Sequence, residues 1–342
     1  MAQSRKMNIF QTIVDIMGLC TLAGAILFYP DRHPFDTIFF MALATVAESQ
    51  SIWIREHETI SISSAVTIAA MMICGPTASI LAAAISVLGS VSRKSAKVYY
   101  HVFNMPFRLT LFNISNYTLT VALTSLLYFR LGGRIIPAAN TFQKVGQAIT
   151  LSALPLLISV FAGVVLNAAL FGLFQWSSGG IGSFKQAVHF LTVPTLNLFF
   201  ICLLGAFLAA VYLQYGWFMV GLFFLPFMLA RYVFVTYKDL QQNYLQTVES
   251  LASAVETKDE YTSGHSRRVE KYSSLIAREM KLSHHRCETI QYAALLHDIG
   301  KIGIPETVLK KSGQLTDEET TLIRQHPEKG AHIIENIEFL SD

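Results

Sequence analysis

The sequence predicts an all-α protein in two parts, a polytopic membrane helical bundle followed by a helical domain outside the membrane. The first observation is charge: residues 1–235 contain 19 charged side chains, about 8%, whereas residues 236–342 contain 30, about 28%. An ordinary soluble domain is about one quarter charged, so only the second part has that composition. The second observation is a series of long apolar runs in the first part, and the third is the lack of an alternating strand pattern after residue 256.

The apolar runs predict about eight membrane spans. Runs close to the ~20 residues that cross a bilayer lie at 9–29, 36–54, 109–129, 148–172, 188–213 and 217–235. One further stretch, residues 60–91, is too long for one helix. Gly75-Pro76 divides it, because proline breaks the helical hydrogen-bond ladder and glycine permits a bend.

An even number of spans puts both ends of residues 1–235 on the same side of the membrane. Basic residues cluster in short segments on the cytoplasmic side of membrane proteins, and here they stand near both ends: Arg5, Lys6, Arg231 and Lys238. We therefore expect a multi-pass protein of the cell membrane with a cytoplasmic C-terminal domain. One loop, which contains Arg130, Arg134 and Lys144, disagrees with the count of eight.

Polar side chains within the spans have two interpretations. An ionisable group in hydrocarbon is a candidate ligand contact, whereas polar side chains also join neighbouring helices by hydrogen bonds. Residues 1–235 are therefore interpreted as a sensory domain, with a transporter as an alternative, and nothing in them names a ligand. The polar groups are Asp15, Glu48, Ser49, Gln50, Asn113, Asn116, Asn167, His189 and Asn197.

Residues 236–255 predict a connecting amphipathic helix. Its apolar residues recur at spacings of four, four, three and four, which is a helical stripe. Two chains that meet along this stripe would form a homodimer through a short parallel coiled coil. Alternatively, the stripe packs on the following domain of its own chain. The stripe residues are Leu240, Tyr244, Val248, Leu251 and Val255.

Residues 256–342 predict a helical domain. Val269, Tyr272, Ile276 and Met280 mark one helix face, and Ile290 to Leu296 belong to a second helix that we expect to end at Gly300. Thr316 to Glu319 form a capping box that opens a third helix running to His326.

His297-Asp298 is the motif that carries chemistry. An apolar helix delivers an imidazole and a carboxylate side by side, and imidazole suits iron, manganese or zinc. The two oxygens of a carboxylate can bridge a divalent metal pair, and such a pair activates water for attack on a phosphodiester. Lys301, about one turn later, can hold that water or a phosphate oxygen as a point charge.

Three sequence blocks together carry a resemblance to a known family. They are Tyr261-Thr-Ser-Gly-His-Ser-Arg-Arg-Val269, Leu296-His-Asp-Ile-Gly-Lys-Ile-Gly-Ile-Pro305 and Ile323-Arg-Gln-His-Pro-Glu-Lys-Gly330. In order and spacing they closely resemble the N-terminal half of the HD-GYP family, bacterial phosphodiesterases that open cyclic di-GMP with two or three metals. The resemblance covers about 90 of the 342 residues.

The resemblance implies roles for five residues. His297 and Asp298 are implied as ligands of a metal pair, iron or manganese, with Asp298 bridging, and His326 as a further ligand. Lys301 is implied as the cation beside the bridging hydroxide, so that Asp298 and Lys301 are the catalytic residues. His265 is implied as a ligand where a third metal is present, or as a residue that lines the site.

The chain departs from the family pattern at two places. Members with three metals have a carboxylate one turn before the equivalent of His265, where this chain has Tyr261 with only Glu260 beside it, and this favours two metals. The family's second half contributes a His-His pair, a Gly-Tyr-Pro loop and another aspartate, which are missing before Asp342. We therefore expect residues 256–342 to be a C-terminally incomplete HD-GYP-like domain, and this chain to be weakly active or inactive.

The sequence therefore favours a membrane-bound, metal-dependent phosphodiesterase of cyclic di-GMP in bacterial signalling. Its expected partners are a cyclic dinucleotide substrate, the lipid bilayer and a second copy of the chain through residues 236–255. DNA is not expected as a partner, because the positive excess lies in short loops between apolar runs. The alternatives are an HD-type hydrolase of another phosphorylated nucleotide and a non-catalytic, truncated membrane receptor.

Overall fold

A computed structural model of the protein describes residues 2–29, 31, 33–55, 58–95, 98–136, 142–178, 184–257 and 264–335. The chain divides into two compact units, Met1–Val233 and Phe234–Asp342. The boundary between the units falls inside one long helix, α7 (Phe184–Glu256). Each unit is described below by itself.

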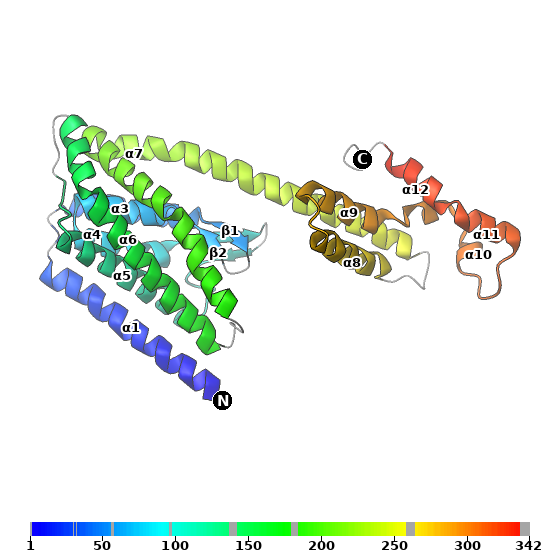
Figure 1. Ribbon diagram of the computed structural model, residues 1–342, viewed down its shortest axis with the longest axis horizontal. Coiled ribbons are helices and arrows are strands. Elements are labelled where there is room, and N and C mark those ends of the chain that lie inside the picture. Colours follow the sequence, from blue (N-terminus) through cyan, green and yellow to red (C-terminus); the bar gives the residue numbers. More distant parts are fainter. Residues whose placement is uncertain are drawn as a thin grey trace. The chain divides into compact units, whose positions relative to one another are not determined.

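The first unit is a helical bundle, in which the helices lie side by side (Figure 1). Gly216, with φ 79°, interrupts the long helix α7. The predicted division of residues 60–91 is confirmed, because Gly75 has φ 99° and a new helix begins at Pro76. The helices are α1 (Ala2–Phe28), α2 (Pro34–Ser49), α3 (Ser63–Ile73), α4 (Pro76–Gly89), α5 (Phe107–Arg130), α6 (Phe142–Ser178) and the first part of α7.

The expected count of eight spans is not confirmed. Among the described residues, three helical stretches are long and apolar enough to cross a membrane: Met7–Phe28, Gln143–Ser177 and Phe200–Glu256. α3 and α4 have 11 and 14 residues. At 1.5 Å per residue they are roughly 16 and 21 Å long, shorter than the ~30 Å hydrocarbon core of a bilayer.

Two β-hairpins interrupt the first unit, and the sequence did not predict them. The expected span 36–54 stops at Ser49 because the chain enters the first hairpin, β1 (Ile52–Arg55) with β2 (Glu58–Ile60). The second hairpin joins β3 (Ser92–Ser95) to β4 (Val98–Tyr100). Ile52 pairs with Ile60, and Ser92 pairs with Tyr100, so the registers agree at an offset of 40 residues. Helix–hairpin–helix therefore occurs twice, as a structural repeat that sequence inspection missed.

Several polar groups of the first unit join its helices. The side-chain amide of Asn116 on α5 donates to the side-chain oxygen of Asn167 on α6 over 3.3 Å. The hydroxyl of Ser63, at the start of α3, donates to the carboxylate of Glu48 at the end of α2. For these groups the structure favours the interhelical interpretation over a ligand contact.

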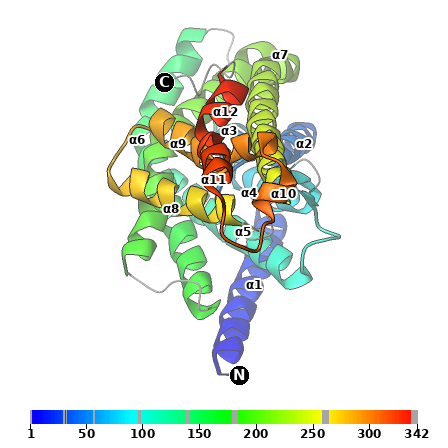
Figure 2. The same ribbon diagram turned by 90° about the vertical axis from the view of Figure 1, so that its right-hand side faces the viewer.

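The second unit is helical in its described residues, as expected. Ser283 caps α9 and accepts from the amide of Arg286, and the predicted capping box between Thr316 and Glu319 is formed. α8 and α9 pack side by side (Figures 1 and 2). The elements are the end of α7, α8 (His265–Glu279), α9 (His284–Leu296), the 3-10 helix η2 (Ile299–Gly303), α10 (Glu306–Leu309), α11 (Asp317–Arg324) and α12 (His326–Ile334).

Two details of these helices differ from the prediction. α9 ends at Leu296 instead of Gly300, because Asp298 leaves the helical conformation and the chain tightens into η2. The predicted apolar face of α8 is largely uncovered by the described residues, since Tyr272, Ile276 and Met280 are 60%, 60% and 66% exposed.

The stripe on residues 236–255 divides into a buried and an exposed part. Val248 and Val255 are buried in a small core with Leu295, Leu296 and Ile299. Leu240 and Leu251 are 64% and 53% exposed. The stripe therefore packs in part on the following domain of its own chain, the second of the two alternatives.

Candidate metal centre

His297 and Asp298 stand where α9 ends against the small core. Ala294, Leu295 and Leu296 are buried, so the last turn of α9 is held firmly. Nδ1 of His297 lies 2.8 Å from the carbonyl oxygen of Ala294. A carbonyl oxygen can only accept, so Nδ1 carries the proton and Nε2 presents its lone pair.

His326 is oriented by the same kind of local hydrogen bond. Its Nδ1 lies 2.8 Å from the carbonyl oxygen of Ile323, which again leaves Nε2 as the ligand atom. Nε2 of His326 is 3.5 Å from Oδ1 of Asp298, and Nε2 of His297 is 3.5 Å from Oδ2 of the same carboxylate. The two imidazoles thus face different oxygens of Asp298, which is the arrangement that a bridging carboxylate requires.

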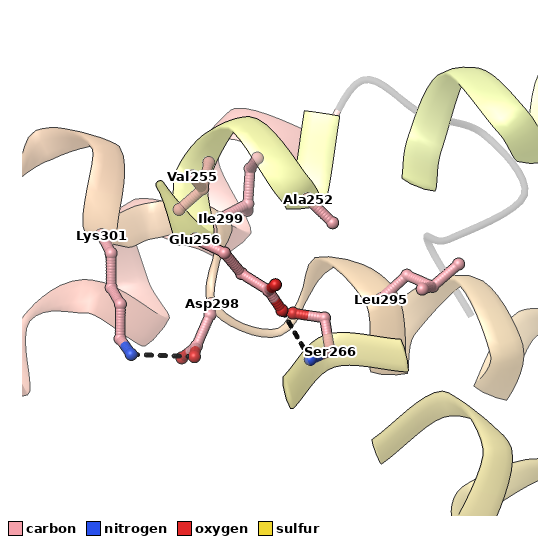
Figure 3. A pocket seen from close by; sticks show the side chains of 8 residues that line it. All are labelled: Ala252, Val255, Glu256, Ser266, Leu295, Asp298, Ile299 and Lys301. Carbon is pink, nitrogen blue, oxygen red and sulfur yellow. Dashed lines mark hydrogen bonds and ion pairs between the residues drawn. The ribbon is translucent and has the colours of Figure 1, made fainter. Parts of the chain in front are cut away.

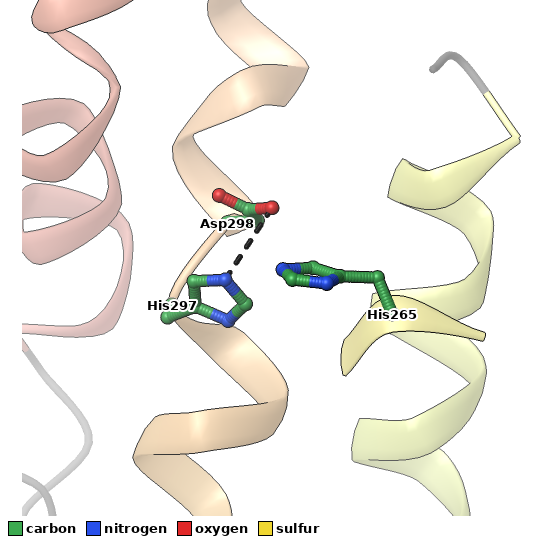
Figure 4. Close-up of side chains that lie close together, drawn as sticks. All are labelled: His265, His297 and Asp298. Carbon is green, nitrogen blue, oxygen red and sulfur yellow. Dashed lines mark ion pairs between the residues drawn. The ribbon is translucent and has the colours of Figure 1, made fainter. Parts of the chain in front are cut away.

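His265 completes the group from the start of α8. Figure 4 shows the side chains of His265, His297 and Asp298 directed toward one another. The two imidazole rings have centroids 5.2 Å apart. One ligand atom from each of the three residues lies within 4.8 Å of the others. Residues from α8 and from the end of α9 therefore meet at one point.

A close backbone approach brings His326 to this point. A Cβ atom on Gly300 would lie 1.9 Å from the carbonyl oxygen of His326 and 2.5 Å from the amide nitrogen of Gly330. No side chain fits at such a distance. Gly300 therefore allows η2 and α12 to be in backbone contact, and this contact places His326 next to Asp298.

Lys301 is the nearest described cation to Asp298. Its Nζ is 2.9 Å from Oδ2, and the two side chains are only 15% and 14% exposed. Figure 3 shows Lys301 pointing at Asp298 on one side of a small pocket. A charge held this close in a partly enclosed site is screened less than a surface pair.

Glu256 lines the same pocket, and the sequence did not indicate it. Its Oε2 accepts from the amide of Gly264 over 2.8 Å, and its Oε1 from the amide of Ser266 over 2.7 Å. Burial raises the pKa of Glu256, but the hydrogen bonds from Ser266 and Gly264 and the nearby His265 outweigh it, so the pKa lies below its usual value. No motif marks this residue, because its hydrogen-bond partners are backbone amides.

Other motif residues lie outside the group. Arg267 pairs with Glu249 on α7 at 2.9 Å and is well exposed, which favours a surface role over a phosphate contact. His284 and His332 pair with nearby glutamates and have side chains that are 89% and 80% exposed, so both are solvated. Glu260 and Tyr261 lie outside the described residues.

The donor set fits a divalent transition metal. Imidazole nitrogens with a carboxylate are ligands that iron, manganese and zinc share. In both His297 and His326, Nδ1 donates to a backbone carbonyl oxygen, which is the usual outer contact of a ligating histidine. Nε2 is therefore left to bind a metal. The residues present therefore suit a metal centre in a helical domain.

The helical second unit and its His-Asp group are similar to those of HD domains. Residues 249–342 match the family model described as HD domain. The chain is 35% identical over 96 residues to the cyclic di-GMP phosphodiesterase response regulator RpfG of Xanthomonas campestris pv. campestris. The aligned residues are 28% of this chain and 25% of that protein. It is 41% identical over 105 residues to a cyclic di-GMP phosphodiesterase of Thermotoga maritima, and these residues are 31% of this chain and 28% of that protein.

A third relative has a different name. The 3'3'-cGAMP-specific phosphodiesterase 2 of Vibrio cholerae is 34% identical over 96 residues, which cover 28% of this chain and 18% of that protein. The chain thus spans about a quarter of the length of the curated relatives it matches, or less. No solved structure matches the chain.

Proposed function

We propose that the protein is a metal-dependent phosphodiesterase that hydrolyses the cyclic dinucleotide cyclic di-GMP. The observation that carries the proposal is the meeting of two oriented imidazoles on the two oxygens of Asp298, with Lys301 2.9 Å from the same carboxylate. The HD-domain match and the names of the relatives support the same reaction class.

The side chains of the site have different roles in the proposed hydrolysis. His265, His297, Asp298 and His326 would hold the metal pair, iron or manganese, with Asp298 as the ligand that both metals would share. When bound, such a pair polarises a phosphate oxygen and lowers the pKa of water. Lys301 attracts a non-bridging phosphate oxygen and holds the phosphodiester in place. Water adds its hydroxyl to phosphorus, the bond from phosphorus to a ribose oxygen breaks, and that oxygen takes up the remaining proton.

The substrate class is supported by the relatives. Those named for cyclic di-GMP and those named for 3'3'-cGAMP act on molecules with the same core, a ring closed by two phosphodiesters. Cyclic di-GMP is the proposed substrate, and 3'3'-cGAMP is the informative competitor in the assay.

The test is hydrolysis by the purified full chain in detergent with Mn²⁺. Only weak hydrolysis is expected of this chain, so long incubations are used. Cyclic di-GMP should give a linear dinucleotide or GMP, separated by chromatography, at a higher rate than 3'3'-cGAMP. His297→Ala should lower the rate at least ~100-fold, because the metal site loses a ligand. His284→Ala, an exposed histidine on the same helix, is the matched control.

Three outcomes would contradict the proposal. Equal rates in His297→Ala and the original chain would overturn the metal assignment. Faster turnover of 3'3'-cGAMP or of another phosphorylated nucleotide would overturn the substrate. A chain that binds Mn²⁺ but hydrolyses none of these compounds would indicate a binding role in place of catalysis.

Membrane placement is the second part of the proposal. The protein is a multi-pass protein of the cell membrane, with the second unit in the cytoplasm. Three helical stretches with sufficient length and apolarity support this placement. Large apolar side chains on the outside of the first unit, such as Leu27, Leu151 and Phe200 at 74%, 81% and 66% exposure, are suited to lipid.

A homodimer through residues 236–255 is the third part. The exposed members of the stripe, Leu240 and Leu251, are available for a second copy, whereas Val248 and Val255 are already buried. Leu240→Cys, in a chain whose four native cysteines are replaced by serine, should form a cross-linked dimer in membranes. Val248→Cys on the same helix should not. Equal cross-linking of both variants, or of neither, would contradict the dimer.

A further inference from the structure

The start of α8 lacks a cap of its own. The first amides of a helix need acceptors from outside the helix, and the usual acceptor is the side chain of the N-cap residue. Here the N-cap is Gly264, which has no side chain and adopts φ 68°, a conformation that glycine tolerates best. The acceptor must come from another part of the chain.

Glu256, at the end of α7, supplies that acceptor with both of its oxygens. Oε2 accepts from Gly264 at 2.8 Å, and Oε1 accepts from Ser266 at 2.7 Å. The two amides belong to the residues on either side of His265. The carboxylate therefore fixes the backbone both before and after the imidazole, and its negative charge also suits the positive end of the α8 dipole.

The same turn of α7 is anchored to the other half of the metal centre. Val255, next to Glu256, is buried in one core with Leu295, Leu296 and Ile299. Those residues flank His297 and Asp298. One turn of α7 thus touches α9 and η2 through apolar side chains and α8 through a carboxylate, as Figure 3 shows for Glu256 and Ser266.

We propose that Glu256 is a positioning residue of the metal centre, which sets His265 at its distance from His297 and Asp298 by bonding the backbone on both sides of it. This inference rests on the proposed metal site. Glu256 itself takes no part in ligation or in hydrolysis: its effect on the metal passes through His265. The end of the connecting helix is therefore a structural component of the site.

The test is a double-mutant cycle on Mn²⁺ binding by the full chain, measured by the spin resonance signal of free Mn²⁺. Glu256→Gln keeps the size of the side chain but leaves one acceptor oxygen in place of two. It should weaken binding about tenfold, since removal of an outer contact to a ligating side chain costs 10–100-fold. In the His265→Ala background the same change should have no further effect.

Two further variants separate positioning from general destabilisation. Glu249→Gln removes a second carboxylate contact between α7 and α8, the surface pair with Arg267, and should leave Mn²⁺ affinity unchanged. Glu256→Asp keeps the charge but is one methylene too short to reach both amides, and should resemble Glu256→Gln. Thermal unfolding of each variant checks that the fold is retained.

The outcomes distinguish this inference from the proposed function. If the original chain binds no Mn²⁺, the metal site itself fails. If it binds Mn²⁺ and Glu256→Gln binds equally well, the metal site stands and the positioning role is wrong. An equal loss of affinity from Glu256→Gln with and without His265 would also overturn the role, because the effect would not pass through that imidazole.

Discussion

Asp298 is the residue on which the candidate centre depends most. Its carboxylate is only 14% exposed, faces the Nε2 atoms of His297 and His326, and lies 2.9 Å from Nζ of Lys301. A partly buried carboxylate needs a counter-charge, and Lys301 supplies one. Lys301 therefore competes with a metal for Oδ2 while it adds the positive charge that a phosphate requires.

Lys301→Met separates these two effects of the lysine. We expect Mn²⁺ to bind at least as tightly as to the original chain, because the competing cation is gone. Hydrolysis should fall about 10²- to 10³-fold, the usual loss when a group that stabilises developing charge is removed. Mn²⁺ titration and product chromatography measure the two quantities.

The control for this change is Lys310→Met, which removes an exposed lysine paired with Glu306 at 3.5 Å. It should alter neither Mn²⁺ binding nor hydrolysis. A more than tenfold loss of Mn²⁺ affinity in Lys301→Met would contradict the competition argument.

Among the elements, the contact of η2 with α12 decides whether His326 reaches the centre. The two elements touch through backbone at Gly300, where even one methyl group has no space. The local hydrogen bond from His326 to the carbonyl oxygen of Ile323 orients the imidazole, but it does not bring the imidazole to Asp298. The close backbone contact of η2 with α12 brings the imidazole of His326 to Asp298.

Gly300→Ala should therefore disrupt the centre without touching a ligand. The new Cβ would lie 1.9 Å from the carbonyl oxygen of His326, so η2 and α12 must move apart. We expect about tenfold or greater loss of Mn²⁺ affinity and a loss of about 1–3 kcal/mol in unfolding free energy, as for other overpacked sites. Mn²⁺ titration and chemical denaturation measure these effects.

Gly313→Ala is the matched control, since a Cβ at Gly313 meets no atom within 4 Å. It should leave both quantities unchanged. If Gly300→Ala binds Mn²⁺ as the original chain does, the close approach is not what places His326.

At the scale of the whole molecule, two units of different composition share one helix. Charged residues make up about 8% of residues 1–235 and about 28% of residues 236–342. Apolar side chains on the outside of the first unit are unfavourable in water and favourable in lipid. The polar second unit has the composition of a domain in water, and it holds the candidate centre.

This difference predicts the location of each part of the chain. A fluorescent protein fused after Asp342 should fluoresce, which requires the cytoplasm. Alkaline phosphatase fused after Asp31, which follows the first span, should be active, which requires the outer side of the membrane. Extraction with carbonate should leave the full chain in the membrane fraction.

The opposite pattern of the two reporters would contradict the proposed orientation. Release of the chain by carbonate would contradict membrane insertion. If alkaline phosphatase is active after Asp31 and the fluorescent protein after Asp342 is dark, both positions lie outside the cell. The chain would then cross the membrane an odd number of times in place of the expected even number.

Local features of the chain were predictable from sequence. The break at Gly75-Pro76 and the capping box at Thr316 depend on the conformational limits of single residues and their near neighbours, and both are found as expected. The residues of the centre, such as His297 and Asp298, were identified by their motifs, and the structure brings them together. Their roles remain proposals.

Features that leave no motif or periodic pattern in the sequence were not predictable. The hairpins at 52–60 and 92–100 are too short for a periodic signal, so they were included in apolar runs or overlooked. The count of about eight spans is not confirmed, because hydropathy records apolar residues but not where helices stop. Glu256 carries no motif, since its partners are amides that every residue possesses.

Composition and short-range pattern therefore establish the helical class, the contrast between the two parts and the residues capable of metal chemistry, because these depend on each side chain and its nearest neighbours. Three-dimensional packing establishes which of those residues meet. Gly300 admits α12, Glu256 holds the start of α8, and the stripe on α7 is divided into a buried and an exposed half. Each of these depends on a contact between different elements, which no local pattern encodes.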